Sequence, residues 1–168
     1  MQRFLKPKPI FSLVIVLLLA SALAVSLLLG TAGRSHASSQ LHVFDHLTAT
    51  SFKFITVGTP SDPRGNYVVF YDPVFDATDT TQIGNDSGIC TVVSSTLQEC
   101  HITFILSNPA GEIAVQGPQL LSGAATTVVA TGGTGSFSGQ EGSATTNQVH
   151  TSSGLEFEFL FTFTQNGQ

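Results

Sequence analysis

The stretch "GLEFEFLFTFT", residues 154–164, alternates apolar and polar side chains with a period of two over most of its length. Because successive side chains of an extended strand point to opposite faces, its apolar members share one face: Leu155, Phe157, Phe159, Phe161 and Phe163. The other face carries Glu156, Glu158, Leu160, Thr162 and Thr164. The stretch therefore predicts a β-strand with one wholly apolar face.

Seven more segments with strand character lie between turn-forming residues, and no helical period of 3.6 residues follows residue 37. They are LHVFDHLT, YVVFYDPVF, GICTVVSS, CHITFILS, EIAVQGPQLL, TTVVATG and EGSATTNQVH. Eight short strands in about 130 residues predict an all-β sandwich or a closed antiparallel barrel. The phenylalanine stripe is then core, and it is also a pocket wall if an eight-stranded barrel holds one small ligand.

The first 37 residues have the layout of a secretory signal: a basic start, an apolar run over residues 10–29, and a small-residue site ending at Ala37. We expect cleavage there, which leaves one domain, residues 38–168, outside the cytoplasm. The apolar run could also span a bilayer of ~30 Å, so an uncleaved N-terminal anchor is the alternative. A chain of this size closes a single hydrophobic core.

Cleavage would leave a strongly acidic domain, with two bases, Lys53 and Arg64, against eleven acids, a formal charge of −9. Such a surface repels phosphate backbones and anionic lipid headgroups. We therefore expect a secreted protein with no nucleic-acid partner and, after cleavage, no membrane partner.

Three motifs in the second half of the domain resemble the allene oxide cyclase barrel family and the related dirigent proteins: VQGP at 115–118, TGGTGSF at 131–137 and GQEG at 139–142. Upstream, VVFYDPVFDATDTTQIGNDSGIC at 68–90 is similar to the family's strand, acidic loop and G-I-C turn. The resemblance runs from about residue 41 to about residue 163. It implies an eight-stranded antiparallel β-barrel of lipocalin-like size, commonly assembled as a homotrimer.

The resemblance also implies an interior that binds an apolar small molecule. In the plant cyclases a fatty-acid epoxide becomes a cyclopentenone without a cofactor, by orientation in an apolar cavity and by carboxylate electrostatics. We therefore expect a cofactor-free isomerase or cyclase. The alternatives are a dirigent-like or binding-only protein, and an extracellular structural module.

The family's site positions carry over onto individual residues of this chain. Val68, Phe70 and Asp72 occupy a strand where the family has valine, phenylalanine and asparagine, so an acid replaces the amide. Cys90 occupies the position of the family cysteine, and Gln119 replaces a tyrosine. With two phenylalanines of the apolar stripe, the predicted ligand-binding set is Val68, Phe70, Cys90, Gln119, Phe157 and Phe159.

The predicted catalytic residues are Asp45 and Asp72. Asp45 corresponds to the family's first-strand acid and shares its face with Val43 and Leu47. If that face is inward, desolvation raises the pKa of Asp45, and Asp72 in the same cavity raises it further. A strand shifted by one residue would instead turn Asp45 out to solvent.

The two cysteines, Cys90 and Cys100, fall directly opposite each other if residues 94–96 form a hairpin turn. Facing Cα atoms of antiparallel strands are ~4.5–5.5 Å apart, which a disulfide can bridge, and an oxidising compartment favours closure. We therefore predict a disulfide on the apolar face. The alternative is a reactive Cys90 in the site.

Neither metal binding nor cofactor binding is expected. His42 and His46 are four residues apart, which on a strand separates them by ~13 Å along one face that we expect to be exposed to solvent. Gly132, Gly133 and Gly135 permit a tight turn, and without a following helix or nearby bases they do not indicate a phosphate site.

Overall fold

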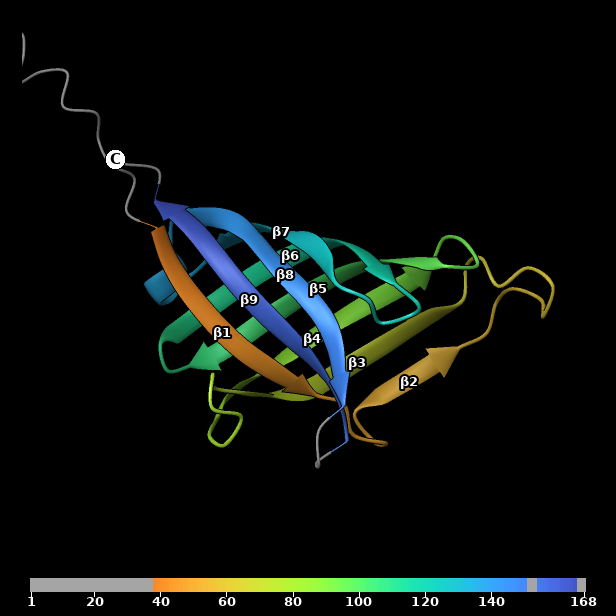
Figure 1. Ribbon diagram of the computed structural model, residues 1–168, viewed down its shortest axis with the longest axis horizontal. Coiled ribbons are helices and arrows are strands. Elements are labelled where there is room, and N and C mark those ends of the chain that lie inside the picture. Colours follow the sequence, from red (N-terminus) through yellow and green to blue (C-terminus); the bar gives the residue numbers. More distant parts are fainter. Residues whose placement is uncertain (1–37, 151–153, 166–168) are drawn as a thin grey trace, which may run out of the picture. The chain divides into compact units, whose positions relative to one another are not determined.

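The computed structural model describes residues 38–150 and 154–165, which form a closed antiparallel sheet (Figure 1). The predicted signal lies outside these residues. The elements are β1 (Ser38–His46), β2 (Phe52–Ile55), β3 (Tyr67–Phe75), β4 (Gln82–Val92), β5 (Leu97–Ser107), β6 (Ala110–Leu120), β7 (Thr126–Gly133), the 3-10 turn η1 (Gly135–Phe137), β8 (Gln140–His150) and β9 (Leu155–Gln165). Over the described ranges, no helix is long and apolar enough to cross a bilayer.

The sheet closes into a barrel because β1 pairs with two strands. Its neighbours run in the order β1-β9-β8-β7-β6-β5-β4-β3, and β1 returns to β3 through Phe44↔Phe75 and Asp45↔Val74. These eight strands are antiparallel to their neighbours, so the predicted eight-stranded antiparallel barrel is confirmed.

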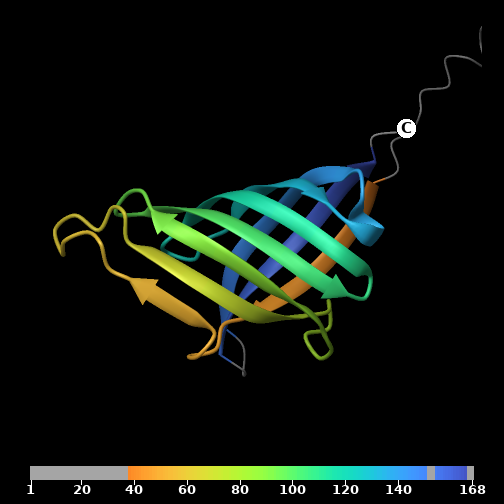
Figure 2. The ribbon, with the colours of Figure 1, turned by 180° about the vertical axis from the view of Figure 1, so that it is seen from behind.

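A ninth strand, β2, was not predicted from the sequence. It pairs with the start of β3, from Phe52↔Phe70 to Ile55↔Tyr67, on the stretch of the β3 edge that β1 does not reach. Figure 2 shows β2 extending the wall at one end of the barrel. Its four residues are too few to show a period, and the β3 edge is available to them only once the barrel is closed.

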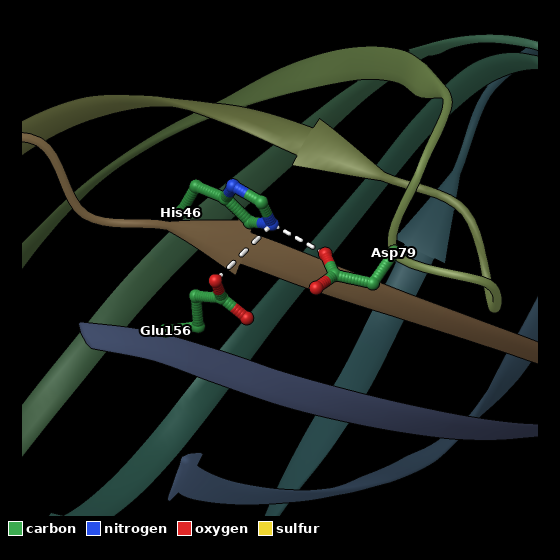
Figure 3. Close-up of side chains that lie close together, drawn as sticks. All are labelled: His46, Asp79 and Glu156. Carbon is green, nitrogen blue, oxygen red and sulfur yellow. Dashed lines mark hydrogen bonds and ion pairs between the residues drawn. The ribbon is translucent and has the colours of Figure 1, made fainter. Parts of the chain in front are cut away.

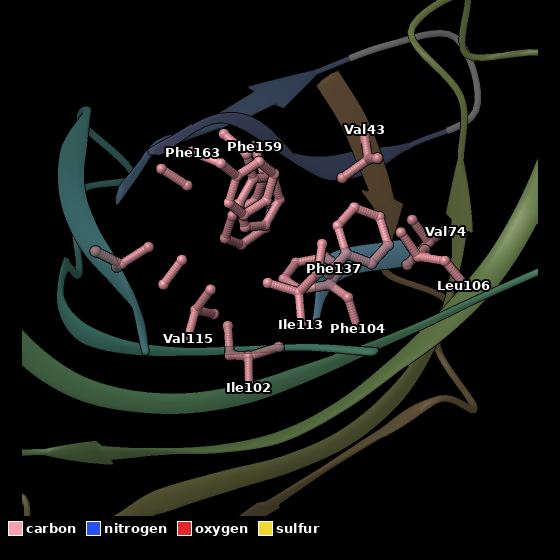
Figure 4. Close-up of a cluster of buried hydrophobic side chains, with 14 of the residues drawn as sticks. Val43, Val74, Ile102, Phe104, Leu106, Ile113, Val115, Phe137, Phe159 and Phe163 are labelled. Atoms are coloured by element: carbon pink, nitrogen blue, oxygen red, sulfur yellow. The ribbon is translucent and has the colours of Figure 1, made fainter. Parts of the chain in front are cut away.

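The apolar stripe of β9 forms the core of the barrel, as predicted. Phe159, Phe161 and Phe163 are buried, and the Phe104 ring of β5 meets the first two edge-on, with centroids 4.9 and 5.3 Å apart (Figure 4). Edge-to-face contacts of this kind stabilise aromatic cores beyond area burial.

Phe137 of η1 adds to this core at the end of the barrel where β7 passes to β8. Gly133 of the glycine-rich turn leaves room for the Phe137 side chain. Any other residue at position 133 would place its Cβ only 2.7 Å from the Phe137 Cβ. The turn therefore has the structural role that the sequence predicted.

The alternation along the strands predicted that His46 and Glu156 point outward, but it did not predict that they are largely buried. His46 and Glu156 are register partners on the outer face of β1 and β9, and the loop at residues 76–81 brings Asp79 over them (Figure 3). His46 Nε2 lies 2.5 Å from Asp79 Oδ1 and 3.6 Å from Glu156 Oε1. The expectation that His46 is exposed to solvent is wrong, since its side chain is only 15% accessible.

The predicted disulfide is present. Cys90 and Cys100 are register partners in the β4–β5 hairpin and are bonded to each other. Both are buried in the core, on the same inner face as Ile102 and Phe104. Cys90 therefore braces the barrel wall and carries no free thiol.

Candidate ligand-binding site

One end of the barrel encloses a cavity of about 290 Å³ with mostly apolar walls. Its lining comes from β1, β2, β3, β4, β5, β6 and β9, together with Leu47 just after β1. The structure brings all eight predicted site residues to this one cavity: Asp45, Asp72, Val68, Phe70, Cys90, Gln119, Phe157 and Phe159.

Several inward positions at this end carry small or polar residues, and these leave room for the cavity. Gly88 is the register partner of Phe70, and a Cβ on Gly88 would lie 2.5 Å from the Phe70 ring. The glycine thus lets this ring lie close against β4. Next along the same face, the Cys90–Cys100 bridge takes less room than two aromatic rings would.

Three buried carboxyl groups meet beside the cavity. Asp45 of β1, Asp72 of β3 and Asp86 of β4 have carboxylate oxygens within 4.8 Å of one another. The Asp72 backbone N–H donates a hydrogen bond to Asp86 Oδ1 at 3.3 Å. Asp45 Oδ1, both oxygens of Asp72 and Asp86 Oδ2 have no hydrogen-bond partner. Of the three, Asp45 and Asp72 line the cavity itself.

Asp86 was not predicted as a site residue. Its signal was nevertheless available, because alternation places it on the same face as Gly88 and Cys90. Cys90 was expected to face inward, and extending that strand by four residues toward its start would have placed Asp86 on the same face.

Burial and mutual repulsion raise the pKa values of these acids. Desolvation raises the pKa of Asp45 most, followed by the charges of Asp86, Asp72 and Glu156. Desolvation likewise raises the pKa of Asp86, and the Asp72 charge adds to it. Burial also raises the pKa of Asp72, with a smaller opposing effect of the Ser51 side chain. Carboxyl groups of this kind can take up and release protons closer to neutral pH than ordinary acids do.

Two groups of side chains have spacings that would admit a metal ion: the three interior acids, and His46 with Asp79 and Glu156. We assign a metal to neither. His46 already pairs with Asp79, and its ring stacks on Phe75 with centroids 3.9 Å apart. The interior acids offer oxygen ligands of the kind that a hard cation prefers. Such a cation needs six or more of them, however, and the rest of the surrounding wall is mostly apolar.

The polar residues opposite the acids are two amides. Gln98 Nε2 donates a hydrogen bond to Gln119 Oε1 at 3.2 Å, and the same oxygen lies 3.3 Å from Cys100 Sγ. Gln119, predicted from the resemblance, thus stands beside the disulfide, and Gln98 of β5 is an additional lining residue that the sequence did not indicate.

The rim of the cavity is aromatic. Phe52 and Phe54 of β2 line the cavity, yet they remain 41% and 56% exposed. Exposed apolar side chains that gather at a cavity indicate a contact surface for a ligand or partner. These two residues were not predicted as site residues, because their strand was not predicted.

A closed barrel with an apolar, acid-bearing cavity at one end defines the class of protein: a small antiparallel β-barrel with an interior cavity. Solved structures share this fold. Pyocyanin demethylase is 26% identical, with 73% of this chain and 98% of that chain covered and a TM-score of 0.57. A pterocarpan synthase dirigent protein is 20% identical, with 77% and 90% covered and a TM-score of 0.60.

A third similar structure is the Diels–Alderase AbmU from Streptomyces koyangensis, 14% identical, with 98% of this chain and 85% of that chain covered and a TM-score of 0.56. The barrel fold expected from the resemblance to cyclases and dirigent proteins is therefore confirmed. No protein-family model matches the chain, and no curated protein matches its sequence. The homotrimer and the removal of the signal stay predictions.

Proposed function

We propose that this barrel binds an apolar small molecule in its cavity and steers a cofactor-free isomerisation or ring closure of that molecule. The observation that carries the proposal is the cavity of about 290 Å³ whose apolar wall is interrupted by Asp45 and Asp72, two buried acids with unpartnered oxygens. A structural module would have a filled interior at this end. The cyclase and dirigent proteins with the same fold support the proposal.

The chemistry needs no second reactant. Asp45 accepts a proton from one atom of the substrate and returns it to another, which leaves an isomer. In a ring closure, the same carboxylates stabilise the positive charge that develops on the substrate, and they do so more strongly where water is excluded. The apolar walls hold the substrate in the reactive conformation.

A dirigent-like role is the second candidate, and one observation favours it. A catalytic base is usually oriented by a hydrogen bond from a neighbouring group, whereas Asp45 Oδ1 has no hydrogen-bond partner. A dirigent-like barrel would hold a reactive molecule made elsewhere and decide only which product forms.

Binding is tested with N-phenyl-1-naphthylamine, an uncharged apolar molecule that fluoresces in apolar surroundings. Val68→Trp fills the cavity, and Val69→Trp is its matched control because Val69 is exposed on the outer face. We expect Val68→Trp to weaken binding by at least about tenfold, a loss of ~1.4 kcal/mol, and Val69→Trp to leave it unchanged. Equal binding by both variants would place the probe outside the cavity and refute the proposal.

The two candidate roles are separated with Asp45→Asn. Solvent extracts of the purified protein, examined by mass spectrometry, supply the copurifying compound as a substrate lead. With that substrate, an isomerase should lose about 10²–10⁴-fold in rate and keep its binding. A dirigent-like barrel should lose product selectivity while the uncatalysed reaction continues. If neither rate nor selectivity changes, Asp45 has no role in the chemistry.

We also propose that the protein is exported. The Cys90–Cys100 bridge supports this, since structural disulfides persist in oxidising compartments. The intact mass of the secreted protein should correspond to a chain that begins at Ser38, and a full-length product retained in the membrane would make it an anchored protein instead.

A further inference from the structure

The charges around the cavity have one sign. Lys53 and Arg64 are the lysine and arginine residues of the described ranges, and both are exposed. Lys53 alternates with Phe52 and Phe54 on β2 and so points away from the cavity. Arg64 pairs with Asp62, its Nε donating to Asp62 Oδ1 at 2.7 Å.

The histidines do not supply a positive charge to the cavity either. His42 and His46 lie on the face of β1 opposite Asp45, where they pair with Glu158 and Asp79. His101 and His150 are exposed to solvent. Within residues 38–150 and 154–165, the charged groups that line the cavity are therefore the carboxyls of Asp45 and Asp72, with Asp86 directly behind them.

These carboxyls lack the partners that buried acids usually have. Oδ1 of Asp45 and both oxygens of Asp72 are buried with no partner in hydrogen-bond geometry, although each residue lines the cavity, and the Ser51 side chain has only a smaller effect on Asp72. A buried carboxylate without a partner is costly, and a second like charge nearby adds to the cost. A cationic ligand would relieve both costs, whereas an anionic ligand would add another negative charge.

The aromatic lining is compatible with the same kind of ligand. Five phenylalanines border the cavity: Phe52, Phe54, Phe70, Phe157 and Phe159. The faces of aromatic rings attract cations within about 6 Å, most strongly where water is excluded. A ligand at the rim would also cover Phe52 and Phe54, which are now partly exposed.

We infer that the occupant of this cavity is an apolar organic cation, with an aromatic or alkyl body against the phenylalanines and one positively charged nitrogen beside Asp45 and Asp72. This inference rests on the proposed binding function and narrows its ligand class. It also departs from the fatty-acid type of substrate that the resemblance to plant cyclases implies, because a carboxylate ligand would meet like charges with no base to offset them.

Three probes that share one naphthalene body test the charge preference: 1-naphthylmethylamine, 1-naphthylmethanol and 1-naphthoic acid. Calorimetry at neutral pH and low salt should show the amine binding at least about tenfold more tightly than the alcohol, consistent with a charged hydrogen bond to a buried acid. The acid should show no measurable binding. An alcohol that binds as tightly as the amine would overturn the inference.

Asp72→Asn identifies the group responsible for the preference. We expect the variant to bind the amine only as well as the alcohol, while Glu112→Gln, which removes one exposed charge from the outer face of β6, keeps the preference. N-phenyl-1-naphthylamine should bind Asp72→Asn normally and so show that the fold and the cavity persist. If Asp72→Asn does not fold, Asp45→Asn serves in the same measurement.

Three further outcomes have distinct meanings. If Ca²⁺ or Mn²⁺ displaces the amine from the wild-type protein and fails to bind Asp72→Asn, the three acids form a metal site and the inference is wrong. If none of the four probes binds the wild-type protein, the proposed binding function itself fails. If N-phenyl-1-naphthylamine binds but 1-naphthylmethylamine binds no more tightly than 1-naphthylmethanol, only the inference about charge fails.

Discussion

The inward side chains differ between the two ends of the barrel, although the same continuous strands run through both ends. Toward one end, inward positions carry the rings of Phe104, Phe161 and Phe163, which pack without leaving a large space. Toward the other end, inward positions of β1 and β3 carry Asp45 and Asp72 around a cavity. We refer to these regions as the packed end and the open end.

The difference teaches how a small barrel can tolerate buried acids. Each acid sits on a strand whose other inward residues belong to the core, such as Val43 on β1 and Val74 on β3. The packed end stabilises the strands, and the open end uses part of that stability to hold buried carboxyl groups with unpartnered oxygens beside the cavity. Functional sites commonly depart in this way from rules that the rest of the fold obeys.

The largest expected effect comes from the packed end. Phe104→Ala removes a ring that meets Phe159 and Phe161 edge-on, so we expect a loss of about 3–5 kcal/mol in the free energy of unfolding. Urea denaturation followed by circular dichroism measures it. Ile105→Ala is the matched control, because the neighbouring side chain is 41% exposed, and it should cost less than about 1 kcal/mol. Similar losses in both variants would mean that the packed end is not the main source of stability.

A smaller effect is expected from the disulfide, which braces the wall of the open end. Replacing Cys90 and Cys100 together by alanine should lower the free energy of unfolding by about 2–3 kcal/mol, because the bridge closes a loop with a sequence separation of 10. Urea denaturation of the double variant measures the loss. Thiol counting on the denatured, unreduced wild-type protein should find no free thiol, and two free thiols would show that the bridge does not form.

The smallest expected effect is a gain in stability at the open end. Burial raises the pKa of Asp86 above its ordinary value of 3.8, so the folded state binds more protons than the unfolded state as the pH rises past that value. Stability therefore falls with rising pH across this window. Asp86→Asn removes the part of the fall that Asp86 causes, and we expect a gain on the order of 1 kcal/mol at pH 7.

Urea denaturation at several pH values checks this prediction. The gain should vanish at pH values below the ordinary pKa of an aspartate, where the carboxyl is protonated in both states. Glu112→Gln replaces an exposed acid on β6 and should change the stability little, both at pH 7 and below the ordinary pKa of an aspartate. If Asp86→Asn lowers the stability at pH 7, the three acids stabilise the barrel and the contrast between its two ends is incorrect.

Much of the candidate site followed from local pattern and resemblance. Alternation along β1 placed Asp45 on the same face as Val43, which the structure shows to be the inner one, and the family positions led to Asp72 and Gln119. Period-two patterning succeeds here because the direction of a strand side chain depends only on its position in that strand. The disulfide was predictable for a similar reason, since a short hairpin determines its own register.

What the sequence by itself determined is the all-β class, the apolar faces of β9 and of the β4–β5 hairpin, and the pairing of Cys90 with Cys100, because these depend on neighbours within one strand or one hairpin. The tertiary structure alone decided where β2 pairs, that Asp86 meets Asp45 and Asp72, and that the loop carrying Asp79 covers His46. These contacts join strands that are distant in sequence. Their geometry depends on how the barrel closes between β1 and β3, and no local period encodes that closure.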